Sequence, residues 1–552
     1  MVYKRGSLKA ILLAGLCISL AACSGGGGGK PSGAGEEKPA VKEEAASPFG
    51  KFGETVTIRY GKASSVDVRL PSGESQENNE YSRFIENELN VKFEHIWQTA
   101  DGDPYKQKID LVIASGDIPD VMVVNEAQLK LLVDSDLIAD LTDVYDKNIS
   151  PELRDVFEST KNLSLASATF DGKLMAVPNS APGADAKNVL FIRKDWLDEL
   201  NLPEPKTLSD IEEVAKAFMD RDPGGNGKNN TIGLMGQQDI VNVGNSIFGF
   251  DTIFSYFDAY PEMWIQTASG EVEYGSIQPE VKTALARLKE MYSKGLIFKE
   301  FVAETASSGR EKVINGKAGM FFGPFWMSGW MLSDSVRLNP KAEWLPLAVP
   351  LDDNGKYKTH TMSPTSSYLV ISKKFHKPEA IIRVLNHEYI LDQTRGEGFY
   401  KDQNVPYNRV NLPLGHMMAP FDEKEVAIGR VDEVIAGTKD YDSLLVHEKL
   451  MYDRVMYDRE NPKKDVIAWS SMISASVFRE ITKNNTVLVS GVFYGKTPTM
   501  ARKWVNLKKL EDETFVQIIM GSKPLDAFDQ FVADWKRLGG DEVTGEVREA
   551  VK

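Results

Sequence analysis

ASGDIPDVMVV, residues 114–124, is the stretch that points most directly to a fold class. Gly116 is typical of a residue that ends a helix, because glycine adopts the left-handed backbone of a helix C-terminus without steric cost. Val121 to Val124 is an unbroken apolar run of the kind found in strands buried on both faces. Such a strand lies in a sheet that helices cover on each side, so the stretch predicts an α/β protein.

Strand and helix patterns alternate on either side of this stretch. Strands are predicted at 55–60, 91–97, 189–193, 317–322 and 367–372, and helices at 81–89, 105–114, 129–137, from Thr207, from Pro279 and from Pro378. From Asp422 onward the pattern is mainly helical. A chain of 552 residues with two such regions predicts two lobes, each a mainly parallel sheet flanked by helices.

The N-terminal segment has the parts of a bacterial secretion signal. Lys4 and Arg5 precede an uncharged apolar run, 10–20, which is shorter than the roughly 20 residues that a helix needs to span a bilayer. Leu20-Ala21-Ala22-Cys23 resembles the lipobox of bacterial lipoproteins. This resemblance implies a signal peptide at 1–22 and a lipid on the Cys23 sulfur. An ordinary secretion signal with an incidental Cys23 is the alternative.

Residues 23–50 have the composition of a tether. Gly25 to Gly29 form an uninterrupted glycine run, and no large apolar side chain follows before Phe49. A segment of this kind cannot bury a core and is predicted to be disordered. It would hold a folded domain away from a membrane surface.

Composition and missing motifs exclude several classes of function. The two cysteines are Cys17 and Cys23, so the body from Phe49 onward has no disulfide and no thiolate metal site. The net charge of −15 argues against nucleic acid and anionic lipid as partners. No later segment is apolar enough to cross a membrane. The chain has no HExxH motif, no nucleophile elbow, no Walker A motif and no GxGxxG after a strand, although a pair of catalytic carboxylates stays open.

Several short motifs, in this order and spacing, resemble one family along almost the whole chain after the tether. They are ASGDIPD at 114–120, DGKLMAVP at 171–178, RKDWL at 193–197, NGKAGM at 315–320, GPFW at 323–326 and LEDETF at 510–515. Together they are similar to the family 1 extracellular solute-binding proteins of carbohydrate ABC transporters, most closely the large lipoproteins of Paenibacillus and Bacillus relatives. Maltose-binding protein is a more distant relative in fold.

The resemblance implies a two-lobed periplasmic-binding-protein type II fold with a ligand cleft between the lobes. The N-terminal lobe is expected at 51–182 and 363–420, and the C-terminal lobe, with its helical end, at 183–362 and 421–552. The chain is expected to cross between the lobes near 179–188 and 361–367. Two lobes without a catalytic motif indicate a cleft that closes by hinge bending.

The function implied by the resemblance is capture without chemistry. The protein is expected to be a lipid-anchored monomer on the extracellular face of the membrane that binds an oligosaccharide and passes it to the permease of an ABC importer. No cofactor is required. A surface lyase or glycosidase, and a receptor for a non-sugar solute such as a peptide, are the alternatives.

A sugar site needs flat aromatic surfaces and planar polar side chains in a concave pocket. Phe325, Trp326 and Trp330 belong to the densest aromatic cluster in the sequence, and glycines interrupt it. Core packing is the competing explanation for Trp264, Trp326 and Trp330. The complete set of predicted ligand residues is Asn125, Glu126, Asn179, Ser180, Trp264, Phe325, Trp326, Trp330 and Tyr368.

One stretch resembles a calcium loop found in part of this family. It is DPGGNGKNN, 222–230, where oxygen ligands would come from Asp222, Asn226, the Lys228 carbonyl and Asn230. Gly224 stands where an acidic or amide residue is usual. A glycine-rich turn without calcium is the alternative.

Overall fold

The computed structural model describes residues 47–551 except 65–69, 101, 184–186, 244–246, 268, 397, 401–406 and 484. The predicted signal peptide, Cys23 and most of the predicted tether lie outside the described residues. The described chain belongs to one compact unit, Glu44–Lys552. Its first residues are already packed, because the Pro48 and Gly50 carbonyls accept hydrogen bonds from Asn386 and Arg383.

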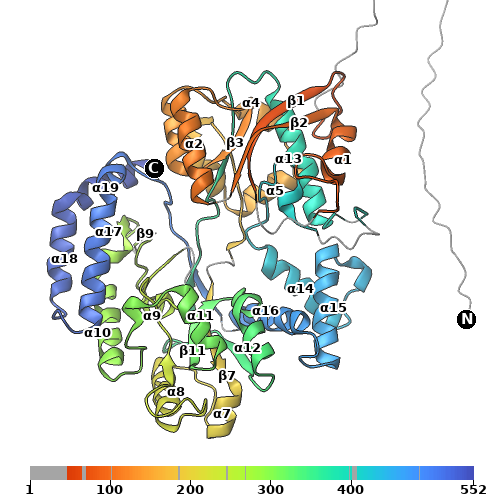
Figure 1. Cartoon of the computed structure of the whole chain (residues 1–552). Coiled ribbons are helices and arrows are strands. Elements are labelled where there is room, and N and C mark those ends of the chain that lie inside the picture. The colour runs from red at the N-terminus through yellow and green to blue at the C-terminus, as the bar shows by residue number, and fades with distance from the viewer. Residues whose placement is uncertain are drawn as a thin grey trace, which may run out of the picture. The chain divides into compact units, whose positions relative to one another are not determined.

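The first of two large β-sheets contains the strand predicted at 121–124. Its order is β2 (Val91–Ala100), β1 (Val56–Ser64), β3 (Val121–Val124), β14 (Tyr368–Ile371) and β6 (Val177–Pro178). Figure 1 shows helices on both sides of this sheet. The helices of this part are α1 (Glu80–Leu89), α2 (Asp103–Ser115), α3 (Glu126–Asp134), α4 (Thr142–Asn148), α5 (Pro151–Ser159), α6 (Leu163–Ser167) and α13 (Pro378–Gln393), with the short hairpin β4 (Thr169–Phe170) and β5 (Lys173–Leu174).

The second sheet has the order β12 (Trp344–Leu347), β7 (Asn188–Arg193), β11 (Ala318–Pro324) and β8 (Ile232–Leu234). Its helices are α7 (Lys194–Leu200), α8 (Leu208–Arg221), α9 (Asp251–Tyr256), α10 (Pro279–Ser293), α11 (Ala306–Ile314) and α12 (Ser333–Leu338). Two smaller pairs accompany it, β9 (Trp264–Gln266) with β10 (Val272–Tyr274), and β13 (Lys358–His360) with β15 (Val487–Val489).

Each of the two large sheets contains one strand that departs from the predicted parallel arrangement. β1 is parallel to β2 and β3, but β14 runs antiparallel to β3 and β6. In the second sheet only the β11–β8 pair is parallel, while β7 is antiparallel to β11 and β12. Parallel pairing needs a helical crossover within one sheet. β14 and β7 instead enter directly from a crossing segment, which brings them in with the opposite direction.

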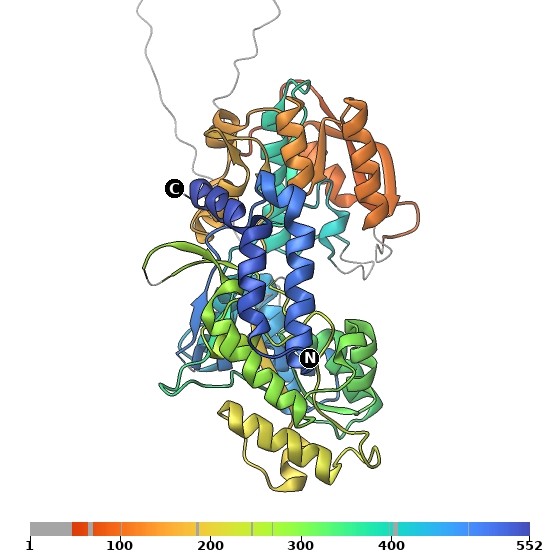
Figure 2. The same cartoon turned by 90° about the vertical axis from the view of Figure 1, so that its left-hand side faces the viewer.

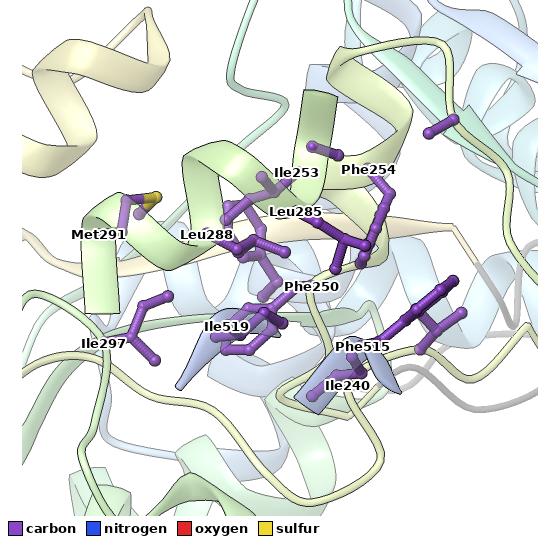
Figure 3. Packing of buried hydrophobic residues seen from close by; sticks show 14 of the residues in the cluster. Ile240, Phe250, Ile253, Phe254, Leu285, Leu288, Met291, Ile297, Phe515 and Ile519 are labelled. Carbon is purple, nitrogen blue, oxygen red and sulfur yellow. The ribbon is translucent and has the colours of Figure 1, made fainter. Parts of the chain in front are cut away.

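The C-terminal helices pack with the second sheet. They are α14 (Glu423–Ile435), α15 (Val446–Glu460), α16 (Val466–Lys483), α17 (Pro498–Ile519), α18 (Ala527–Trp535) and α19 (Asp541–Ala550). Figure 2 shows α17 and α18 side by side, in blue. Figure 3 shows Phe515 and Ile519 of α17 among buried side chains from α9 and α10, such as Phe254 and Leu288. A separate core of residues between 56 and 177 and between 368 and 418 supports the first sheet.

Local signals explain where several helices begin. The Thr207 side chain accepts a hydrogen bond from the Asp210 N–H, so α8 begins where the sequence predicts it. The helix predicted at 129–137 begins earlier, at Glu126, because Asn125 caps it by accepting a hydrogen bond from the Gln128 N–H.

Candidate functional site

Three chain segments lie side by side where the sequence predicts the crossings. Ala181 N–H donates to the Pro364 carbonyl, and Ser180 N–H donates to the Met417 carbonyl. The Gly183 N–H donates to the Phe421 carbonyl at 2.8 Å. Segment 179–183 is therefore hydrogen-bonded to both 364–367 and 417–421, and the predicted site residues lie on either side of this junction.

The register of the first sheet gathers the predicted polar residues at one edge. Tyr368 pairs with Val124 on one side and with Pro178 on the other. Asn125 and Asn179 directly follow those two partners, so they lie at the same edge of the sheet as Tyr368. The parallel strand β3 ends here, which is the edge where ligand sites form in open α/β sheets.

The second sheet places its aromatic residues at the matching end. Asn188, which follows the first crossing, pairs with Pro324 at the end of β11. Phe325, Trp326 and Trp330 come directly after Pro324 and therefore lie near the crossing end of this sheet. Sequence order alone could not show that the two predicted groups share this junction.

Trp326 and Trp330 form a reachable aromatic pair. Their ring centroids lie 5.9 Å apart at 64°. Trp330 is 36% exposed, and the Arg310 guanidinium lies 5.3 Å from its ring centroid. Trp326 is half-buried against the core beneath it. Phe325 is also half-buried, but its ring packs on Phe478 of α16 at 5.1 Å.

The predicted role of Trp264 as a stacking platform is corrected. Its side chain is only 4% exposed and belongs to the main core of the second sheet. Its ring lies against Tyr274 and Trp504, with centroid distances of 5.1 and 6.4 Å. These aromatic neighbours occupy the surface on which a sugar would stack, so core packing explains this residue.

The predicted amide and hydroxyl residues hold the junction together. The Asn179 side-chain oxygen accepts hydrogen bonds from the Ser366 and Ser367 N–H groups at 2.8 and 2.9 Å. The fully buried Ser180 hydroxyl donates to the Ala419 carbonyl. Together with the capping role of Asn125, these contacts commit the side-chain oxygens of all three residues to the fold.

Glu126 and Tyr368 remain close together at the edge of the first sheet. Burial, and to a smaller extent the nearby Glu126 charge, raises the pKa of Tyr368 to about 12. Burial also raises the pKa of Glu126, and a hydrogen bond from the Lys496 N–H partly offsets the rise. The Tyr368 side chain is 4% exposed, so only a small part of the phenol is available to a ligand.

Sequence reasoning missed the segment that touches Glu126. A side chain on Gly495 would lie 2.8 Å from the Phe493 ring and 3.2 Å from a Glu126 oxygen. Phe493 and Tyr494 are both half-buried beside the junction. The run Ser490 to Gly495 combines aromatic residues with two glycines and follows a strand, which is the pattern that singled out the residues after β11.

The predicted calcium loop is largely satisfied by its own hydrogen bonds. Asp222 accepts hydrogen bonds from the Asn226 and Gly227 N–H groups and from the Thr231 hydroxyl. The hydrogen bond from the Thr231 hydroxyl is the main reason that the pKa of Asp222 lies below its ordinary value. Within 222–230 the side-chain oxygens of Asn226 and Asn230 and the Lys228 carbonyl have no donor from the described residues. These oxygens fit a weak calcium site with one carboxylate.

Among the helices of the described ranges, none is both long and apolar enough to cross a membrane.

Comparisons with known proteins agree with this architecture. The family model of the bacterial extracellular solute-binding proteins matches residues 77–387. Among curated relatives, the polygalacturonan/rhamnogalacturonan-binding protein YtcQ of Bacillus subtilis is 23% identical over 85% of this chain and 87% of its own. Lipoprotein LipO of Bacillus subtilis is 30% identical over 39% of this chain and 41% of its own.

A solved structure extends the likeness to the fold. It is the Streptococcus pneumoniae ABC-transporter substrate-binding protein FusA, an EF-hand mutant in complex with fructo-nystose. The likeness covers 90% of this chain and 98% of FusA with 17% identity and a TM-score of 0.60. The two-lobed solute-binding-protein fold is therefore confirmed. The family and these relatives are binding proteins rather than enzymes.

Proposed function

Because the chain belongs to the family of bacterial extracellular solute-binding proteins, we propose that it captures an oligosaccharide and delivers it to the permease of an ABC importer. The observation that best supports an oligosaccharide as the ligand is the Trp326–Trp330 pair beside the junction of the lobes. Sugars present apolar C–H faces that stack on such rings, while their hydroxyls need polar groups nearby. YtcQ and FusA, a fructooligosaccharide-binding protein by name, support the same ligand class.

The proposed mechanism is closure of the lobes on the sugar, without chemistry. The lobes are proposed at 51–182 with 363–420, and at 183–362 with 421–552. A sugar that contacts both lobes binds the closed form more tightly and therefore shifts the population toward it. Small-angle scattering with and without saturating ligand tests this step, with a smaller radius of gyration expected for the complex.

A lipid anchor on Cys23 is proposed to keep this monomeric receptor at the extracellular face of the membrane. The lipobox-like sequence and the name of LipO support it. Cys23→Ala should release the protein into the medium or leave the precursor uncleaved. Processed mutant that stays fully on the membrane would contradict the anchor.

A weak structural calcium ion is proposed for the loop at 222–230. Asp222 would supply the only carboxylate, and Asn226, Lys228 and Asn230 would supply neutral oxygens. Calcium sites with few charges bind weakly. When bound, the ion would fix the loop and take no part in sugar capture.

A thermal-shift screen of plant and bacterial oligosaccharides, with peptides as a second panel, tests the function. A ligand that binds the native state raises the melting temperature by mass action. At least one oligosaccharide should therefore raise the melting temperature of this protein. Chromatography of the same mixtures should show no product. Stabilisation by peptides alone would point to a non-sugar receptor, and product formation would point to a surface enzyme.

A further inference from the structure

A pocket lies at the end of β7 that is opposite to the junction of the lobes. β7 has six residues and runs from Asn188 at the junction to Arg193, so its ends are roughly 17 Å apart. The pocket has a volume of about 350 Å³. Its walls come from the start of α7, the turns at 223–224 and 314–316, and the end of α12 with the following residues to 341.

The floor of this pocket is an arginine held rigidly in place. The Arg193 side chain is 4% exposed, and its Nε and Nη2 donate to the two Asp195 oxygens at 2.7 and 2.5 Å. Its guanidinium also lies 4.6 and 5.7 Å from the ring centroids of Trp196 and Trp344. The described residues offer Nη1 no acceptor. Arg193 lines the pocket, so Nη1 would donate a hydrogen bond to an acceptor oxygen of a ligand bound there.

The rim of the pocket offers both donors and acceptors. Among the described residues, no side chain pairs with the Lys341 ammonium or the Glu199 carboxylate, and both residues are exposed. The Asn339 oxygen is used by the Lys341 N–H, which leaves its amide N–H₂ for a ligand. The Asn315 amide nitrogen donates to the Glu311 carbonyl, which leaves its oxygen for a ligand.

The balance of charges in the pocket disfavours an ion. Asp195 neutralises Arg193, and the rim carries one further charge of each sign, on Glu199 and Lys341. An anion would meet two carboxylates, and a cation would meet two basic groups. The exposed side chain of Leu338 adds apolar surface. A ligand suited to these walls has hydroxyls that both donate and accept, and an apolar face.

We propose that this pocket binds a neutral sugar unit and forms a second carbohydrate site on the C-terminal lobe. The volume lies at the lower end of the roughly 300–1,000 Å³ of small-molecule sites, which suits one or two sugar rings rather than a long chain. The site is independent of capture between the lobes. It would add a second point of attachment for a carbohydrate near the receptor.

Saturation-transfer-difference NMR with single sugars tests the proposal. The probes are D-glucose, D-galactose and L-rhamnose, with D-galacturonate as the charged comparison. The pocket variant is Glu199→Ala with Asn339→Ala, both at exposed positions. The matched control is Glu213→Ala, an exposed glutamate of α8 that does not line the pocket. Trp326→Ala serves as the variant of the site between the lobes.

At least one neutral sugar should give a signal with wild type, Glu213→Ala and Trp326→Ala, and the signal should fall at least fivefold in the pocket variant. Three results would overturn the proposal: no signal from any neutral sugar, a signal unchanged in the pocket variant, or a signal from galacturonate alone. Loss of the signal in Trp326→Ala would assign it to the lobe junction and also overturn the second site. Failure of oligosaccharide capture would appear separately, in the thermal-shift screen.

Discussion

The Glu126 carboxylate accepts a hydrogen bond from the backbone N–H of Lys496 at 2.5 Å. Glu126 is the first residue of α3 and follows the end of β3 in the first sheet. Lys496 directly precedes the cap of α17, a helix that packs in the core of the second sheet. The contact therefore joins the two lobes at the junction where the candidate site lies.

Replacing Glu126 should weaken the fold. Hydrogen bonds to charged groups contribute about 1.5–3 kcal/mol, so Glu126→Ala should lower the free energy of unfolding by about that amount. Glu126→Gln keeps an acceptor and should lose less. Urea unfolding at pH 7 measures both. The exposed Glu94→Ala is the matched control, and an Ala variant as stable as this control would contradict the prediction.

Trp326→Ala should weaken sugar binding more than it weakens the fold. Stacking on a ring contributes about 1–3 kcal/mol by analogy with aromatic stacking on bases. The dissociation constant should therefore rise roughly ten- to a hundredfold. Calorimetric titration with the best ligand from the screen measures the affinity, and thermal unfolding measures the stability.

Trp264→Ala is the comparison for a tryptophan buried in the core. Removing such a side chain costs about 3–5 kcal/mol of stability. The folded fraction of Trp264→Ala should still bind sugar normally. If Trp326→Ala is the unstable variant and binds normally when folded, the platform role passes to Trp330.

Calcium should raise the melting temperature of the wild-type protein, and a chelator should reverse the rise. Asp222→Ala should abolish this response because it removes the only carboxylate of the loop. It should also lower the melting temperature in chelator, since Asp222 accepts hydrogen bonds from Asn226, Gly227 and Thr231. Asp220→Ala, at an exposed carboxylate two residues earlier, is the control. Identical wild-type melting curves in calcium and chelator would favour the plain turn.

His416 should make the protein less stable in acid. Burial lowers its pKa to about 4, below the ordinary value of 6.5. Between pH 6.5 and pH 4 the unfolded chain binds a proton at this histidine more tightly than the folded chain does. The stability that neutral His416 contributes is therefore complete above pH 6.5 and is lost as the pH falls toward 4. From pH 7 to pH 5 the loss from this residue is about 2 kcal/mol.

Comparison of variants isolates this residue from the other buried histidines. His416→Gln should show a smaller loss of unfolding free energy between pH 7 and pH 5 than wild type. The matched control is His376→Gln, at an exposed position. Equal pH dependence in wild type and His416→Gln would contradict the assignment.

Features fixed by neighbouring residues could be predicted from the sequence. The Thr207 cap, the glycine stop at 116 and the apolar strand at 121–124 depend on a few adjacent side chains, and the structure has each of them. The strand predicted at 367–372 is β14 over Tyr368–Ile371. The family resemblance supplied the two-lobed arrangement, which local patterns alone left as two α/β regions.

Features fixed by distant residues could not be predicted. The direction of β14 depends on a crossing from the other lobe, which alternation of strands and helices does not reveal. The residues next to Trp264 in the sequence do not reveal whether its ring is exposed or buried. Trp504 of α17, which covers this ring, is brought to it only by folding. Glu126 and Lys496 are 370 positions apart, so no local pattern connects them.

The position of β14 in the first sheet has a consequence for biosynthesis. β14 lies between β3 and β6, yet it follows the second crossing, and Asn179 and Ser366 are 187 positions apart. At about 5–20 residues per second, a ribosome needs roughly 10–40 s to make the intervening chain. During that time β3 and β6 lack their shared neighbour, and unpaired strand edges invite aggregation. Any folding of the first sheet before β14 is available would therefore leave two strand edges without their partner.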